Sequence, residues 1–408
     1  MRRWLTPSVV VPCAIIAAVA AMVVSANLRE GRPHGRPSPV PPSIGSVGAP
    51  PTSSDGLARR IAEMERRLGA DPDDLHAAVS LAEALVRQSR VTGDGGVVAR
   101  AASVLERATQ ADPLHYGVRH MLATVRLSQH RFRDALALAA ECQAQRPDDA
   151  SVDGMIGDAH LELGDYEAAF AAFERMVQRR PNAASYARVA YARELQGDLQ
   201  GALHSMTLAA DAAGGGDLEG QAWYRSQVGE LQLALGRPAE AMQQFAQASQ
   251  AFPGHPFAVT GYARALEAMG RRGDALALLQ DLASRAPSAD VYERIGALLS
   301  SLGQADAAAK AYAHAEAAWR SDTPEPRQLA RFLADRGTRL DEAVRIAEDA
   351  SRDRQDIFTQ DALAWAYFKS GRLTEARHWS TLAQRTGSKD PQIRAHAVAI
   401  ASAAGSAG

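Results

Sequence analysis

A spacing of about 34 residues recurs along most of this sequence. The glycines that interrupt its helical stretches are Gly164, Gly197, Gly236, Gly270, Gly303, Gly337 and Gly371. Successive differences between them are 33, 39, 34, 33, 34 and 34 residues. A second marker, a proline that follows a helical stretch, keeps the same spacing at Pro113, Pro147 and Pro181. Two markers with one spacing predict a chain of repeated structural units rather than one globular core.

Each unit has the pattern of two amphipathic helices. In the stretch 151–181, Ile156, Ala159 and Leu163 recur at helical spacing, and a second apolar run follows Gly164. Glycine accepts the backbone angles that end a helix, so Gly164 marks the turn between the two helices. A small residue recurs inside the second helix of each unit, as expected for a closely packed seam: Ala101, Ala135, Ala169, Ala202, Ala241, Ala275, Ala308 and Ala376.

The same stretch resembles the tetratricopeptide repeat. That pattern is W-x2-L-G-x2-Y, then A-x3-F, then a closing proline. Gly157, Ala169 and Phe173 match it, whereas Asp153 and His160 stand where the pattern has Trp and Tyr. His130 occupies the turn position of an earlier unit. The resemblance implies an all-α fold, a tetratricopeptide-type α-solenoid of about nine helical hairpins over residues 57–404, with the segment 392–403 as a capping helix.

Two segments of a different kind precede the repeats. Residues 1–26 combine Arg2 and Arg3 with an apolar run from Val9 to Val24, which predicts a signal peptide or a transmembrane anchor. Residues 27–56 are rich in Pro, Gly and Ser and predict a disordered linker. We expect a single-pass N-terminal hydrophobic helix, inserted through residues 8–26, with the repeats outside the cytoplasm. The alternative is export after cleavage near Ala26.

No pattern of catalytic, cofactor-binding or metal-binding residues emerges. The metalloprotease, P-loop and nucleophile-elbow patterns are absent from the sequence, and Cys13 and Cys142 are its only cysteines. The 45 basic and 47 acidic residues give a net charge of -2, which provides no electrostatic case for nucleic acid. We therefore expect no enzyme activity, no cofactor, no metal and no small-molecule substrate.

The resemblance implies a binding surface for protein or peptide partners. In tetratricopeptide arrays the first helices of successive hairpins line a concave groove. Mapped by repeat position, the candidate groove residues are Asp158, Glu162, Arg188, Tyr191, Gln227, Glu230, Arg264 and Trp365. The preferred interpretation is a non-catalytic scaffold or adaptor. The alternatives are a regulatory or assembly subunit of an envelope enzyme or transporter complex, and an enzyme whose site lies on the repeats, at Asp158 or Glu162.

Overall fold

The protein is an array of α-helices. The computed structural model describes residues 54–92, 96–214, 217–321 and 326–405, and within them it has twenty helices and no strand, so the predicted all-α fold is confirmed. The predicted hydrophobic helix in residues 1–26, and the linker up to residue 53, lie outside the described residues. None of the helices in the described ranges has the length and apolar character needed to cross a membrane.

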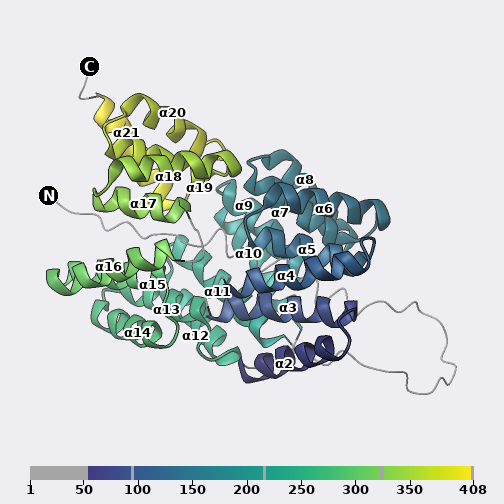
Figure 1. Ribbon diagram of the computed structural model, residues 1–408. Coiled ribbons are helices and arrows are strands. Elements are labelled where there is room, and N and C mark those ends of the chain that lie inside the picture. Colours follow the sequence, from purple (N-terminus) through teal and green to yellow (C-terminus); the bar gives the residue numbers. More distant parts are fainter. Residues whose placement is uncertain (1–53, 93–95, 215–216, 322–325, 406–408) are drawn as a thin grey trace.

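The helix bounds follow the repeat pattern closely. In chain order the helices are α2 (Ser54–Ala70), α3 (Leu75–Thr92), α4 (Gly96–Ala111), α5 (Tyr116–Ser128), α6 (Phe132–Gln145), α7 (Ala150–Glu162), α8 (Tyr166–Arg179), α9 (Ala183–Leu195), α10 (Leu199–Ala212), α11 (Leu218–Ala234), α12 (Pro238–Ala251), α13 (Pro256–Ala268), α14 (Arg272–Arg285), α15 (Ala289–Ser301), α16 (Ala305–Arg320), α17 (Pro326–Arg336), α18 (Leu340–Asp353), α19 (Ile357–Lys369), α20 (Leu373–Ala383) and α21 (Pro391–Gly405). From α3 to α20 they form nine consecutive hairpins in the described chain, with α2 before them and α21 after them (Figure 1). Helix α2 begins within the segment predicted as linker, because Ser and Asp are favoured at the start of a helix.

The turns between paired helices lie where the glycine spacing places them. All seven predicted turn glycines have positive φ angles, from 64° to 83°. His130 takes the same role with φ of 58°, although it carries a side chain. The longer turn before α18 places Arg339 at φ of 49°, immediately after Gly337 and Thr338. The repeat spacing therefore sets the hairpin turns, including the one that lacks glycine.

Small residues allow neighbouring helices to pack closely. The eight predicted seam alanines, from Ala101 to Ala376, are at most 2% exposed. Glycines on the first helices accept an aromatic ring from the second helix of the same hairpin. A Cβ on Gly157 would lie 2.4 Å from Cε1 of Phe173, and a Cβ on Gly229 would lie 2.7 Å from Cε1 of Phe245. These distances leave no room for a side chain at either glycine.

The array closes on itself, so its C-terminal hairpins rest on the third and fourth hairpins. In Figure 1, α18 and α19 are the C-terminal helices that lie nearest to α9. The backbone N–H of Gln355 donates to the carbonyl of Glu162 at 3.1 Å, and the N–H of Ile357 donates to the hydroxyl of Tyr166 at 2.8 Å. A Cβ added to Gly197 would lie 2.5 Å from the carbonyl oxygen of Gly387. Residues about 190 positions apart thus meet on the inner side of the superhelix.

A second long-range contact joins the first hairpin to the fifth. Arg90 of α3 forms two hydrogen bonds with the Glu219 carboxylate of α11, at 3.0 and 2.5 Å, and Arg87 lies 3.4 Å from Asp217. Burial opposes ionisation of Glu219, but the Arg90 charge and its hydrogen bonds outweigh that penalty and hold the pKa of Glu219 below its usual value. Ion pairs of the chain itself therefore close this part of the inner side.

Candidate functional site

One part of the inner side stays open. A cavity of about 330 Å³ lies between the first helices of the fourth to seventh hairpins, α9, α11, α13 and α15. Phe358 of α19 and the segment 388–391, which ends at the first residue of α21, complete its wall. This volume is at the lower end of the range that is typical of ligand pockets, and it accommodates a few side chains of a bound polypeptide.

The repeat places equivalent residues on the cavity wall. Tyr191, Glu230 and Arg264 each lie six residues before a turn glycine (197−191, 236−230 and 270−264), and all three line the cavity. Glu194 and Glu267 lie three residues before those glycines and also line it. Because residues three or four apart share one face of a helix, each first helix contributes one short polar stripe.

Two ion pairs occupy part of the wall. Arg264 of α13 pairs with Glu230 of α11, and Arg294 of α15 lies 3.1 Å from Glu267 of α13. Burial and the neighbouring Arg264 charge lower the pKa of Arg294. Each pair joins one hairpin to the next, so these four charges balance one another within the wall.

The carboxyl groups of Glu194 and Asp390 are different. No salt bridge or side-chain hydrogen bond joins Glu194 to another described residue. Burial, and then the charges of Asp390 and Glu230, raise the pKa of Glu194 to about 8. Burial raises the pKa of Asp390 to about 6, although its Oδ1 accepts the N–H groups of Gln392 and Ile393 at the start of α21. The cavity therefore contains acidic groups without a compensating cation in the described chain.

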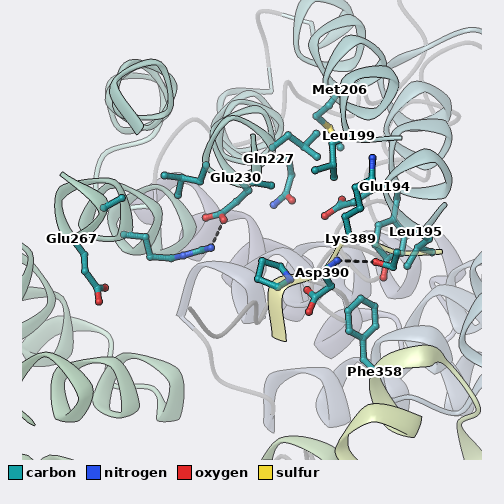
Figure 2. Close-up of a pocket in the computed structure, with 18 of the residues that line it drawn as sticks. Glu194, Leu195, Leu199, Met206, Gln227, Glu230, Glu267, Phe358, Lys389 and Asp390 are labelled. Atoms are coloured by element: carbon teal, nitrogen blue, oxygen red, sulfur yellow. Dashed lines mark hydrogen bonds and ion pairs between the residues drawn. The ribbon is translucent and has the colours of Figure 1, made fainter. Parts of the chain in front are cut away.

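Two further polar side chains in the wall lack partners. Gln227 is 3% exposed, makes no hydrogen bond with the described residues, and in the view of Figure 2 its amide lies between the Glu230 and Glu194 carboxylates and points into the cavity. The Tyr191 hydroxyl is buried and also lacks a hydrogen-bond partner in the described structure. Burial raises the pKa of Tyr191 well above its usual value.

The structure divides the predicted groove residues into two groups. Tyr191, Gln227, Glu230 and Arg264 line the cavity together. Four others lie elsewhere, among them Asp158 and Arg188, which are at most 2% exposed and form a bidentate ion pair at 2.9 and 2.6 Å. Their side chains satisfy each other and do not reach the surface.

Glu162 and Trp365 are also engaged within the protein. Glu162, 1% exposed, pairs with Arg354, which comes from the end of the eighth hairpin. Trp365 stacks on His396 with ring centroids 3.9 Å apart, and its indole N–H donates to Asp335 at 2.8 Å. Both residues lie on the first helix of a hairpin, but the closure of the array covers Glu162, and His396 of the C-terminal helix α21 stacks on Trp365.

Several cavity residues are not among the predicted ones. Glu194 shares the face of Tyr191 on α9, so extending the groove pattern by three residues identifies it. Phe358, Lys389 and Asp390 carry no such signal. They reach the cavity only because the C-terminal hairpins fold back onto the fourth hairpin. No group of His, Cys, Asp or Glu in the described chain is arranged to hold a metal ion.

Comparison with known families agrees with this architecture. Two family models, both described as tetratricopeptide repeat, match residues 120–184 and 232–302. The chain is a tetratricopeptide repeat (TPR) protein. The matched segments contain the turn glycines Gly164, Gly236 and Gly270, which have positive φ angles. No curated protein matches the sequence of this TPR protein.

Several solved structures are similar to the TPR array. Human IFIT1, as a dimer with m7Gppp-AAAA, is 14% identical, with 82% of this chain and 77% of that chain covered and a TM-score of 0.54. Yeast Tom70 is 15% identical, with 85% of each chain covered and a TM-score of 0.46. A thermophilic TPR protein from Thermus thermophilus is 23% identical, with 42% of this chain and 92% of that chain covered and a TM-score of 0.39. At such identities the likeness concerns the fold.

Proposed function

We propose that this TPR protein is a non-catalytic scaffold that binds a segment of another polypeptide in the cavity between α9, α11, α13 and α15. The observation that carries the proposal is an open region on an inner side that ion pairs close elsewhere. It is lined by the first helices of successive hairpins, and it contains polar groups without partners. Polar groups that are removed from water without partners cost free energy, so a ligand that pairs with them binds favourably.

The charges of the wall favour a polypeptide over RNA. One similar structure, human IFIT1, contains m7Gppp-AAAA. In this chain the wall carries four carboxyl groups and four basic side chains, and four of these eight groups are already joined in the pairs Arg264–Glu230 and Arg294–Glu267. A nucleic-acid phosphate in this cavity would meet the Asp390 carboxylate, and like charges repel.

The proposal includes attachment to a membrane. The apolar run within residues 8–26 supports a single-pass N-terminal anchor, with the TPR array outside the cytoplasm. Alkaline washing of membranes from the native host is expected to leave the full chain in the pellet. Recovery of a soluble form whose N-terminus lies just after Ala26 would instead support export after cleavage.

The binding proposal is tested by photo-crosslinking at the cavity. Ala234 is exposed at the cavity mouth, so a benzoylphenylalanine at this position contacts a bound segment. The matched control replaces Ala171, an exposed alanine on α8 that does not line the cavity. We expect protein adducts from position 234 and none of the same mass from position 171. Identical adduct patterns from the two positions, or no adduct from either, would contradict the proposal. The identity of the adduct separates a free-standing adaptor from a subunit of an envelope enzyme or transporter.

A further inference from the structure

We propose that the cavity receives a positively charged side chain, lysine or arginine, from the bound polypeptide, and that Glu194 and Gln227 hold the charged group. This inference rests on the proposed function and specifies the chemistry of the partner. The two residues come from neighbouring hairpins, Glu194 from α9 and Gln227 from α11, and both face the same space (Figure 2).

Pairing within the wall leaves two acidic groups, Glu194 and Asp390, without a salt bridge in the described chain. Glu230 and Glu267 are neutralised by Arg264 and Arg294. Glu194 has no cationic partner, and only Oδ1 of Asp390 is used, by the N–H groups at the start of α21. A cation is therefore the ligand group that would compensate Glu194 and the remaining oxygen of Asp390.

The two remaining basic residues of the wall do not fill this role. Arg272 is exposed at the first residue of α14, and Lys389 is exposed in the connection before α21. The Lys389 side chain runs beside the turn at Gly197, where an added Cβ would lie 3.3 Å from Lys389 Cγ. Neither residue forms a salt bridge with Glu194.

Gln227 provides an observation that is independent of the carboxyl groups. Its side chain is almost fully buried, has no hydrogen-bond partner in the described structure, and projects into the cavity. A primary amide oxygen accepts hydrogen bonds from an ammonium or guanidinium group. Its amide atoms are not fully enclosed but open onto the cavity, so a donor group of a ligand can reach them.

The apolar part of the wall suits the aliphatic stem of the same side chain. Leu195, Leu199, Met206 and Phe358 line the cavity beside the acidic groups. Lysine and arginine carry methylene chains that pack on apolar surfaces while the charged end reaches a polar partner. An acidic ligand side chain would repel the Asp390 carboxylate, and a purely apolar one would cover Glu194 and Gln227 without giving either a partner.

The test selects peptides from a random dodecapeptide phage library on the full-length protein at pH 8. Selected peptides are synthesised, and their dissociation constants are measured for the wild type and four variants. Ala234→Trp blocks the cavity mouth. Glu194→Gln removes the charge at constant size, and Gln227→Met removes the amide at similar volume. Glu240→Gln is the matched control, because Glu240 is exposed on α12 and does not line the cavity. Circular dichroism checks that each variant is folded.

The outcomes separate this inference from the proposed function. We expect the selected peptides to share a lysine or arginine next to apolar residues and to lose binding to Ala234→Trp. We also expect them to bind Glu194→Gln at least about tenfold more weakly, with Gln227→Met weakened and Glu240→Gln unchanged. Peptides that require an open cavity, but lack a shared basic residue or bind Glu194→Gln as well as wild type, would overturn this inference and leave the proposed function standing. If no peptide depends on the cavity, both proposals are wrong.

Discussion

Replacement of Gly229 by alanine is expected to destabilise the array, although alanine is the better helix former. The Phe245 ring is fully buried against Gly229, and an added Cβ would lie 2.7 Å from both Cε1 and Cζ of the ring. Carbon atoms pack favourably at about 3.5–4.0 Å, so the ring must move by roughly 1 Å. Gly261 of α13 already packs on the same ring, where its own Cβ would lie 2.1 Å from Cε1. The ring therefore has no free space to move into.

Two opposing contributions determine the change in the free energy of unfolding. Overpacking a buried site costs about 1–3 kcal/mol, whereas glycine to alanine inside a helix gains about 0.5–1 kcal/mol. We expect Gly229→Ala to lower the free energy of unfolding by about 1–2 kcal/mol, and Gly229→Leu to cost more because more atoms must fit. Urea unfolding followed by far-UV circular dichroism measures the change.

The controls isolate the clash from helix propensity. Gly273 lies in α14 with nothing within 4 Å of an added Cβ, so Gly273→Ala is expected to leave stability unchanged or raise it. In a Phe245→Leu background the smaller side chain should reduce the cost of Gly229→Ala, as a double-mutant cycle would report. A Gly229→Ala protein that unfolds at the same or higher urea concentration than the wild type would refute this account of the packing.

Three other substitutions test the electrostatics and the turns. The pKa of Glu194 is about 8 in the folded protein, above the value of 4.5 of an exposed Glu. The folded state therefore loses stability as pH rises from 4.5 to 8, because ionisation of Glu194 is easier in the unfolded chain. Glu194→Gln should raise the melting temperature at pH 8 and change it little at pH 4.5. Glu162→Leu removes the buried carboxylate that pairs with Arg354 and should lower the free energy of urea unfolding by about 3 kcal/mol; a loss below about 1 kcal/mol would show that the pair does not hold the closure. His130→Gly relieves a left-handed backbone and should raise the unfolding free energy by about 1 kcal/mol, so a lower value would contradict the strain argument.

The sequence predicts the hairpins well because their determinants are local. A turn glycine, a seam alanine and a closing proline each act within one or two helices, and Gly164 and Ala169 occupy the expected structural roles. Even His130, which lacks the usual turn chemistry, is identified by spacing alone. Position within the repeat also assigns the first helices to the inner side. Tyr191 and Arg264, which were predicted on this basis, line the cavity.

The closure of the array is not encoded locally. The path of a solenoid depends on a small rotation between neighbouring hairpins, which accumulates over the whole array. Glu162 meets Arg354 after 192 residues, and no short pattern in either segment reports that contact. For this reason repeat position alone cannot separate Glu162, which is covered, from Leu195, which occupies the equivalent position and lines the cavity.

The closed and open parts of the inner side use equivalent positions in the repeat. Glu162 lies two residues before its turn glycine, as do Leu195, Ala234 and Ala268, which line the cavity (164−162, 197−195, 236−234 and 270−268). In the third hairpin the Arg354 guanidinium covers this position and pairs with the carboxylate. In the fourth hairpin the adjacent carboxyl group, Glu194, has no such partner, and its pKa is raised to about 8. The chain itself thus illustrates how a cationic side chain from a distant segment closes this face. A bound polypeptide that supplies the same chemistry to Glu194 would complete, between α9 and α11, the contact that Arg354 makes with Glu162.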